Sequence, residues 1–456
     1  MFGKKLFMPL VCSALFGLAA CSSDSSNPSV PGENPGENGV PGENGGSTPT
    51  PSSVPLSAGA NPAVPEAMYT SWLGYHFTTL EAEKATYPSI ASNFAEVFTP
   101  AFQPAGRVVW STQSSGGYKT DCYVEDAAVP DMKYRACTVS EGIGYGMLLS
   151  TFQGDTDTFT RLWNYSRAIR AYRGSALTAW ITKSFDYRNV DNSSATDADL
   201  DIATSLILMH IKTGEQAYLS DALSIAGAIW DTEINPTTKL IYSGNTDMWY
   251  GANPTYNLSY FSPVALRLFA KYDTTHDWNA VIANMYEYMI KVQDAGTGVF
   301  PDWSDASGIA VNPPNGAAGK NESTYTWYTF NKESVRIPWR IAWDYYWYED
   351  ANAKKVLTKL NEFIVGKSGG DPTSLALAAN YSWDPTKADK TGATVVSSQW
   401  LSAWCATGLA GNADWLDKCT AAVNARMPGN NGSSYFPDIL LVMYAQLLNG
   451  KYVRPF

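Results

Sequence analysis

The chain has 456 residues, of which 45% are apolar, so it is long enough to bury one large core or two ordinary ones. Its formal net charge of −11 disfavours binding to nucleic acid and to anionic membrane surfaces. Tryptophan (16 residues) and tyrosine (27 residues) are abundant, and their rings serve either as core packing or as flat platforms for a ligand.

The N-terminal segment has the layout of an export signal. Lys4 and Lys5 form a short basic region, and an apolar run over residues 6–20 stops at Cys21. Within residues 1–20 the run is too short to cross a bilayer and is typical of a signal peptide. The sequence Leu-Ala-Ala-Cys at 18–21 resembles a bacterial lipobox. This implies cleavage before Cys21, a lipid anchor on its thiol, and a lipoprotein of the cell envelope or surface; a plain secretory signal is the alternative.

Residues 21–62 have low sequence complexity. Pro-Gly-Glu-Asn occurs three times between residues 31 and 44, and a stretch rich in Gly, Ser, Thr and Pro follows. Such a sequence cannot bury a core and predicts a disordered, extended tether. Since no second linker follows, residues 63–456 are predicted to form one domain.

This domain is predicted to be helical, because apolar residues recur at three- and four-residue spacing in many segments. Strand-like alternation is sparse and there is no repeated βα unit. We therefore predict an all-α fold, a toroid of helical hairpins with loops at one end around a groove. The predicted helices are 80–98, 141–153, 156–173, 198–213, 215–231, 261–272, 276–293, 336–349, 351–366, 397–409, 412–425 and 436–449.

Four cysteines follow the signal and the anchor: Cys122, Cys137, Cys405 and Cys419. An even number in an oxidising compartment predicts two disulfides. Of the three possible pairings, Cys122–Cys137 with Cys405–Cys419 closes the shortest loops and is the predicted one. Neither pair has zinc-ligand spacing and the chain has three His, so neither a metal site nor a cofactor is predicted.

Glu141 lies in the glycine-rich segment Ser-Glu-Gly-Ile-Gly-Tyr-Gly-Met at 140–147. Ser140 is expected to cap a helix whose early turns hold three glycines. Glycine costs about 1 kcal/mol relative to alanine inside a helix, so the three indicate close approach of another helix or of a ligand. Apolar surroundings would raise the pKa of Glu141, as a general acid requires. The alternative is an ordinary acid in the first turn of a helix.

Three aspartates lie in the segment 195–203. Asp197 and Asp201 are four residues apart and are expected to share a helix face, while Asp199 points elsewhere. Stabilisation of a helix start is the plain alternative. Calcium binding is disfavoured, because the glycine and the terminal glutamate of an EF-hand loop are missing.

A third acidic segment contains Glu333 and Arg336, which are three residues apart and can pair. A guanidinium partner keeps a carboxylate ionised, which suits a general base better than an acid. An ordinary surface ion pair is the alternative.

These three segments, in this order, resemble glycoside hydrolase family 8. Residues 140–147 match its Ser-Glu-Gly-x-Gly-Tyr-Gly-Met segment. Residues 195–203 match its Ala-Thr/Ser-Asp-x-Asp-x-x-Ile-Ala signature, and residues 336–340 match the Arg-x-Pro-Trp-Arg of its glucanase branch. The resemblance makes residues 63–456 a catalytic domain and implies an (α/α)6 barrel with an open cleft. It also implies inverting hydrolysis, in which one carboxylic acid protonates the leaving oxygen while a carboxylate activates water.

The resemblance assigns roles residue by residue. Glu141 takes the position of the proton donor, and Asp197 that of a carboxylate that contacts the sugar at the cleavage point. Tyr260 matches a tyrosine that holds the nucleophilic water, and Trp180 looks like a stacking tryptophan. The residues expected to bind substrate are Tyr260, Trp180, Arg336, Tyr145 and Trp339.

The chain departs from the family at its usual base. Many members have Asp-Ala-x-Arg where this chain has Glu333-Ser-Val-Arg336, so the carboxylate here is one methylene farther from the backbone. Glu333 is the predicted base, and Asp344 or an acid in the 302–322 loops are the alternatives. Without compensation the longer arm displaces the water, and such misplacement can cost about 10²-fold in rate.

The expected activity is that of an inverting endo-β-1,4-glycanase, a monomer whose partner is plant cell-wall polysaccharide. Arg340 favours cellulose-type or mixed-linkage β-glucan, since xylan-acting relatives tend to have Asn there. Xylanase, reducing-end exo-oligoxylanase and chitosanase activities are the alternatives. An alternative from another class is a non-catalytic, sugar-binding surface lipoprotein, which only the change from Asp to Glu at 333 favours.

Overall fold

The computed structural model describes residues 52–86, 95–110, 137–183, 192–313, 326–387, 390–391, 394–429 and 434–456. The predicted signal peptide, Cys21 and most of the predicted tether lie outside these residues. In the described ranges helices predominate, and the strands form two-stranded antiparallel ladders only. The predicted all-α class is therefore confirmed. None of the helices in these ranges is long and apolar enough to cross a membrane.

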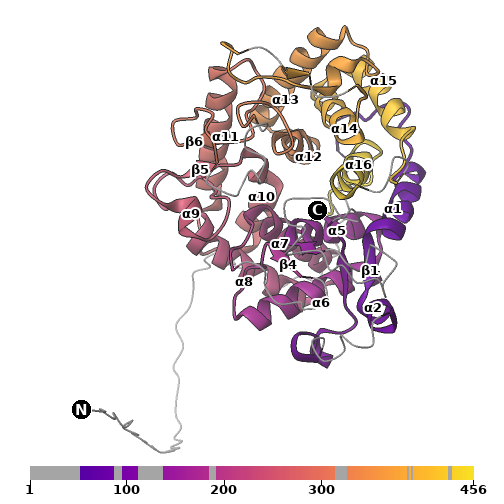
Figure 1. Cartoon of the computed structure of the whole chain (residues 1–456), viewed down its shortest axis with the longest axis vertical. Coiled ribbons are helices and arrows are strands. Elements are labelled where there is room, and N and C mark those ends of the chain that lie inside the picture. The colour runs from indigo at the N-terminus through magenta and orange to yellow at the C-terminus, as the bar shows by residue number, and fades with distance from the viewer. Residues whose placement is uncertain are drawn as a thin grey trace, which may run out of the picture. The chain divides into compact units, whose positions relative to one another are not determined.

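Six helices of the described chain form a closed inner ring, in which each packs on the next and the last packs on the first. They are buried on nearly every side; in α7, every residue from Thr196 to Met209 is buried. Figure 1 shows them around the centre of the molecule. The inner helices are α5 (Ser140–Gln153), α7 (Thr196–Thr213), α10 (Pro263–Tyr272), α12 (Ile337–Tyr348), α14 (Ser398–Ala406) and α16 (Tyr435–Leu448).

Six outer helices of the described chain cover this ring, each packed on one or two inner helices. They are amphipathic: α13, for example, buries Val356 and Leu360 and exposes Lys354 and Lys355. Inner and outer helices alternate along the chain, and α1 packs on α16 to join the two ends, which is the predicted (α/α)6 arrangement. The outer helices are α6 (Thr156–Arg173), α8 (Gln216–Glu233), α11 (Trp278–Ala295), α13 (Ala351–Ser368), α15 (Ala413–Asn424) and α1 (Ala63–His76).

Short elements connect the helices. The ladder of β3 (Thr138–Val139) with β4 (Ile181–Thr182) pairs Val139 with Ile181 just before α5 begins. The 3-10 turns η4 (Leu258–Tyr260) and η5 (Ser334–Arg336) precede α10 and α12. The other short elements are α2 (Leu80–Thr86), α9 (Asp247–Tyr250), η2 (Pro100–Phe102), η6 (Leu375–Ala378), η7 (Thr407–Ala410), β1 (Phe77–Thr79), β2 (Gly106–Val108), β5 (Thr255–Tyr256), β6 (Ser304–Asp305), β7 (Ala379–Asn380) and β8 (Lys390–Thr391).

Most predicted helices are present with ends within three residues of those predicted. One difference occurs near the N-terminus. Helix α1 is not predicted, because Pro65 and Gly74 are weak helix formers and interrupt the pattern. The predicted helix 80–98 is present as α2 over Leu80–Thr86, and residues 87–94 of this prediction lie outside the described residues.

The three glycines of α5 are explained by close packing, as the sequence predicts. A Cβ on Gly144 would lie 3.0 Å from the carbonyl oxygen of Ala198 on α7. A Cβ on Gly142 would lie 3.2 Å from the ring of Tyr435, and one on Gly146 would lie 2.8 Å from a side chain of α6. The approaching groups come from neighbouring elements of the barrel. The glycines thus let α5 pack closely enough for α7 and α16 to meet at its first turn.

The segment 52–62, predicted as part of the tether, packs on the domain. Val54 and Ser57 are buried. The backbone N–H of Ala58 donates to Asp417 of α15 at 2.9 Å, and that of residue 61 donates to Asn449 at 2.8 Å. The compact region therefore begins before the predicted boundary at residue 63.

The cysteines agree only in part with the predicted pairing. Cys137 is disulfide-bonded, and Cys122, its predicted partner, lies outside the described residues. Cys405 and Cys419 are free, so the predicted disulfide between them is wrong. The Cys419 thiol is buried and lies 3.9 Å from the carbonyl oxygen of Leu401. Burial raises its pKa, which keeps it in the unreactive thiol form.

Candidate active site

The candidate site lies at the N-terminal ends of inner helices. These helices run in one direction, because outer helices alternate with them, and so their first turns gather at one end of the barrel. Glu141 is the second residue of α5, and Asp197 is the second residue of α7. Tyr435 begins α16, and Arg336 directly precedes α12. The positive ends of the helix dipoles there favour carboxylates.

One guanidinium joins the three predicted carboxylates. Nη1 of Arg336 lies 2.5 Å from Oε2 of Glu141 and 2.9 Å from Oδ2 of Asp197, while Nη2 binds Oε2 of Glu333. The Arg336 side chain is only 3% exposed. The structure therefore brings together the three acids predicted from the sequence and confirms the pairing of Glu333 with Arg336. Three carboxylates around one cation favour retention of a proton by one of them.

Glu141 has the surroundings of a general acid. Burial raises its pKa, and the charge of Glu333 adds to this, while Arg336 and a hydrogen bond from Tyr435 oppose it. The Tyr435 hydroxyl donates to Oε1 of Glu141 at 2.7 Å. The Glu141 side chain is still 17% exposed and so is accessible from outside the core. A carboxylic acid with a raised pKa and an accessible oxygen can protonate a leaving group.

Asp197 is held more deeply than Glu141. Its side chain is 1% exposed, and burial, with the neighbouring charge of Glu141, raises its pKa to about 7 against the effect of Arg336. Oδ1 accepts the backbone N–H of Ala198 at 2.9 Å. The residue thus lies at the site, with both oxygens engaged by the protein.

Glu333 has one engaged and one open oxygen. Oε2 accepts hydrogen bonds from Arg336 and from Nδ2 of Asn257, the latter at 2.9 Å. Among the residues that the structure describes, Oε1 has no hydrogen-bond partner, and the side chain is 17% exposed. A carboxyl group with one open oxygen has the geometry of a base that accepts a proton from water.

The acids predicted as alternative bases are bound by other residues. Asp344 is fully buried, and its carboxylate accepts from Arg267 at 2.7 Å and from the hydroxyl of Tyr286 at 2.6 Å. Asp302 is also buried, and its Oδ1 accepts from the backbone N–H and the hydroxyl of Ser334 at 2.9 and 2.7 Å. Asp302 therefore fixes the backbone beside Glu333. Both acids are therefore engaged by other groups. Oδ1 of Asp305 accepts from the backbone N–H groups of residues 307 and 309, and Glu322 lies outside the described residues.

Tyr260 and Trp180 border the carboxylates. The ring centroid of Tyr260 lies 5.4 Å from the guanidinium carbon of Arg336. Burial and the charge of Asp197 hold the pKa of Tyr260 well above its usual value, so the phenol keeps its proton. Trp180 is half-buried, and its carbonyl oxygen accepts from the N–H of Ser140 at 2.9 Å, directly beside Glu141. Both residues therefore lie beside the carboxylates, and their contacts with water and sugar stay predictions.

Two of the predicted substrate contacts, those of Tyr145 and Trp339, are corrected by the structure. Tyr145 and Trp339 are fully buried, with ring centroids 5.9 Å apart, and the Trp339 indole donates to Tyr452. They form core beneath the site, since they lie one helical turn deeper than Glu141 and Arg336 respectively. Arg336 binds the three carboxylates, and its contact with substrate stays a prediction. Ser140 does not cap α5, because the helix begins at this residue, and its side-chain oxygen has no partner in the described chain.

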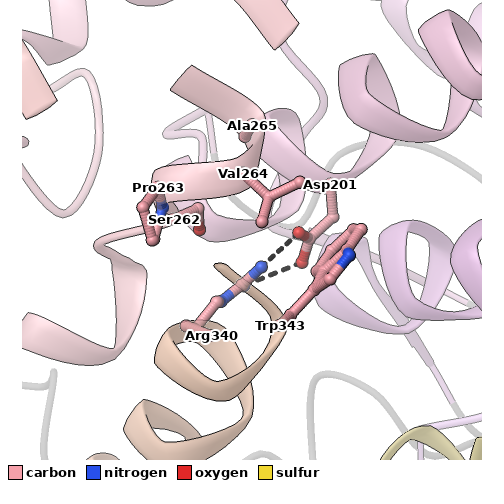
Figure 2. Close-up of a pocket in the computed structure, with 7 residues that line it drawn as sticks. All are labelled: Asp201, Ser262, Pro263, Val264, Ala265, Arg340 and Trp343. Atoms are coloured by element: carbon pink, nitrogen blue, oxygen red, sulfur yellow. Dashed lines mark hydrogen bonds and ion pairs between the residues drawn. The ribbon is translucent and has the colours of Figure 1, made fainter. Parts of the chain in front are cut away.

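A second ion pair lies one turn deeper. Figure 2 shows Arg340 of α12 bound to both carboxylate oxygens of Asp201 on α7. The four-residue spacing of Asp197 and Asp201 thus matches that of Arg336 and Arg340, and it locks α7 to α12. Asp199 points elsewhere, as predicted, and accepts the N–H of residue 178 at 2.9 Å. The match of these two spacings is a signal from which the pairing could be predicted.

Residues 105–397 match the family described as Glycosyl hydrolases family 8. The chain belongs to this family. Endoglucanase C of Ruminiclostridium cellulolyticum is 35% identical over 232 residues, which cover 50% of this chain and 47% of that protein. The chain therefore spans about half the length of that family 8 relative. Beta-glucanase of Niallia circulans is 27% identical over 391 residues, which cover 81% of this chain and 90% of that protein.

A solved structure supports the fold of this family 8 chain. The apo β-1,3-1,4-glucanase of Paenibacillus sp. X4 superposes with a TM-score of 0.67 at 21% identity. The superposition covers 89% of this chain and 97% of that one. The likeness extends over the whole ring of paired helices, which confirms the (α/α)6 barrel.

Proposed function

We propose that this family 8 chain is an inverting endo-β-1,4-glycanase that hydrolyses cellulose-type or mixed-linkage β-glucan. The observation that carries the proposal is the binding of Glu141, Asp197 and Glu333 to one buried guanidinium, that of Arg336. An inverting glycosidase needs one protonated and one ionised carboxyl group on opposite sides of the scissile bond.

In the proposed reaction Glu141 donates its proton to the leaving oxygen as the bond from that oxygen to the anomeric carbon breaks. Oε1 of Glu333 takes a proton from the water that attacks the anomeric carbon from the other face. Glu141 becomes charged and Glu333 becomes neutral, so Arg336, which binds both, keeps a constant total charge around it. The buried guanidinium stabilises the transfer without changing its own protonation.

The neighbouring residues orient the attacking water and the sugar. The Tyr260 phenol, which keeps its proton, is proposed to hold the attacking water against Glu333. Trp180 is proposed to stack on a sugar ring next to Glu141, since its ring is only half-buried. Asp197 is proposed to contact the sugar at the cleavage point once substrate displaces part of its contact with Arg336.

The choice of β-glucan rests on two supports. Arg340 completes the Arg-x-Pro-Trp-Arg segment of the glucanase branch. Relatives that are 35% and 27% identical to this chain are named Endoglucanase C and Beta-glucanase. The proposed partner is therefore a neutral plant cell-wall polysaccharide.

A substrate panel tests the proposal. The domain is incubated with carboxymethyl-cellulose, lichenan, xylan and chitosan, and new reducing ends are measured over time. We expect activity on the first two, with a rapid fall in viscosity of carboxymethyl-cellulose, which indicates cleavage inside the chain. Activity on xylan alone or chitosan alone would replace the glucan assignment. Inactivity on all four would favour a sugar-binding protein without catalysis.

We also propose that the protein is a monomeric lipoprotein of the cell envelope. The support is the basic and apolar leader that ends at Cys21. Labelled palmitate should enter the parent protein in bacterial cells and should not enter the Cys21→Ser variant. Size-exclusion chromatography with light scattering should give the mass of one chain. Equal labelling of both proteins would refute the anchor.

A further inference from the structure

The turn before α10 contains a buried asparagine with a fixed orientation. Asn257 is 1% exposed, and its Oδ1 accepts from both the backbone N–H and the hydroxyl of Ser259, at 3.1 and 2.6 Å. A backbone N–H can only donate, so the atom that faces it must be the amide oxygen. The amide nitrogen therefore points the other way, and there Nδ2 donates to Oε2 of Glu333 at 2.9 Å.

This hydrogen bond differs from the one that Arg336 makes with the same oxygen. The guanidinium of Arg336 is shared with Glu141 and Asp197, so its position depends on the charge of all three carboxylates. Asn257 is neutral, and its Nδ2 has no other carboxylate partner among the described residues. With two donors on Oε2, the carboxyl group of Glu333 is held in one rotation, with Oε1 left open.

The asparagine is in turn fixed to the deep part of the barrel. Ser259 donates its N–H and its hydroxyl to Asn257, and its carbonyl oxygen accepts from Nε of Arg340 at 3.3 Å. Arg340 is held by both oxygens of Asp201, as Figure 2 shows. The side chains of Arg340 and Asp201 are at most 2% exposed. A continuous chain of buried contacts thus runs from α7 and α12 through the 257–259 turn to Glu333.

We infer that Asn257 is a positioning residue that holds the longer side chain of Glu333, so that Oε1 faces the attacking water. This inference rests on the proposed function, in which Glu333 is the base. A glutamate has one more rotatable bond than the aspartate that many family members carry. The neutral donor at Oε2 removes that freedom, which offsets the misplacement that the extra methylene would cause.

The main test is a double-mutant cycle on β-glucan hydrolysis with Asn257→Ala and Glu333→Gln. Asn257→Ala should lower kcat by about 10–10²-fold with KM within about 2-fold, because the base is misplaced but the cleft is intact. In the Glu333→Gln background the same change should have almost no further effect, because the group it positions is already gone. Asn284→Ala, on outer helix α11, is the matched control and should leave kcat unchanged.

A second variant tests the role of the donor while keeping the oxygen that caps the 257–259 turn. Asn257→Asp keeps the oxygen that caps Ser259 but replaces the donor with a carboxylate that repels Glu333. The other ionisable groups around Glu333 are Arg336, Glu141, Asp197 and Tyr260. They are unchanged in this variant. The acidic limb of the kcat/KM profile should therefore move to higher pH, because the base binds its proton more tightly.

The outcomes distinguish a failure of the proposed function from a failure of the inference on Asn257. If Glu333→Gln leaves kcat unchanged, the assignment of the base fails, and the inference fails with it. If Glu333→Gln abolishes activity while both Asn257 variants keep the parent kcat and pH profile, only the inference is overturned. Equal losses from Asn257→Ala in the parent and in the Glu333→Gln background would also overturn it, because Asn257 would then act independently of Glu333.

Discussion

Helix α7 carries aspartates into two clusters of buried carboxyl groups that differ in kind. Asp197 joins Glu141 and Glu333 at Arg336, whereas Asp199 faces the neighbouring carboxyl group of Glu233. Burial raises the pKa of Asp197 and of Asp199 to about 7, so the two aspartates are equally perturbed.

The surroundings separate the two clusters. Asp199 and Glu233 are completely buried, and one carboxylate oxygen of each has no hydrogen-bond partner in the described chain. The Arg336 cluster has a shared cation, and two of its carboxylates are partly exposed. A raised pKa thus marks a buried acid, and of these two clusters only the Arg336 cluster has the exposed carboxyl groups that chemistry needs.

The largest effect is expected at the proton donor. Glu141→Gln removes the proton but keeps the size of the side chain, so kcat on β-glucan should fall by about 10³–10⁴-fold. The measurement is the initial rate of reducing-end release, with circular dichroism to check folding. Glu362→Gln, at an exposed position on α13, is the matched control and should keep full activity. A loss of less than about 10-fold would contradict the assignment of Glu141.

The next effect concerns the base. Glu333→Gln should lower kcat by about 10²–10⁴-fold. Glu333→Asp keeps the charge but shortens the arm in a setting built for glutamate, so it should lose about 10–10²-fold. Both are measured with the same rate assay. Higher activity in Glu333→Asp than in the parent would show that the barrel is shaped for aspartate and that the glutamate is not compensated.

A smaller effect is expected from Tyr435→Phe. The Tyr435 hydrogen bond stabilises the charged form of Glu141 and so lowers its pKa. Its loss should raise the pKa further. Because the protonated form is the active one, activity is lost as the pH rises through this pKa, and the basic limb of kcat/KM should move to higher pH by about half a unit to one unit. A shift to lower pH would contradict this role.

The smallest effect is expected on stability, from Asp199→Asn. The folded-state pKa of Asp199, about 7, lies above its unfolded value, so the folded state retains a proton that the unfolded state releases. Stability is then full below about pH 4 and falls as the pH rises to about 7. The variant lacks this carboxyl group, so its stability should not fall in this way. The difference in Tm between variant and parent should therefore be at least about 3 °C larger at pH 8 than at pH 5.

The control for this thermal measurement is Asp231→Asn, at an exposed position on α8, which should show no such pH-dependent difference. Catalytic rates of Asp199→Asn at pH 6 should stay within about 3-fold of the parent. A loss as large as that of Glu333→Gln would mean that the sealed cluster takes part in the chemistry.

Much of this fold follows from local patterns. The helices of the barrel have clear apolar periodicity and glycine ends, and so their positions were predictable. The glycines of α5 indicated close packing, because their cost inside a helix needs a compensating contact. The failure at α1 has a local cause too, since Pro65 weakens the helical signal while its packing on α16 is a tertiary effect.

The site was predictable only where residue type and motif agree. Glu141 and Glu333 lie where the family motifs place them, but motifs do not tell which helix face is accessible, so Tyr145 and Trp339 were assigned wrongly. Asn257 and Tyr435 meet their carboxylates across 76 and 294 residues, and no spacing along the chain indicates such contacts.

The predicted disulfide between Cys405 and Cys419 is also wrong. Cys405 and Cys419 lie on consecutive helices, and proximity along the chain favoured a disulfide. In the folded domain each thiol is fully buried in the packing between α14 and α15. The two thiols interact with each other, so the spacing predicts their proximity but not whether they are oxidised.

The most direct test of the central claim is the anomeric configuration of the first product. The parent domain is mixed with a soluble β-1,4-glucan oligosaccharide, and proton NMR follows the new reducing end before mutarotation. Glu141 as acid and Glu333 as base, on opposite faces of one bond, require a single displacement, so the α-anomer should appear first and the β-anomer should follow slowly. Initial formation of the β-anomer would contradict the account, because it requires a covalent intermediate and a nucleophile in place of the base.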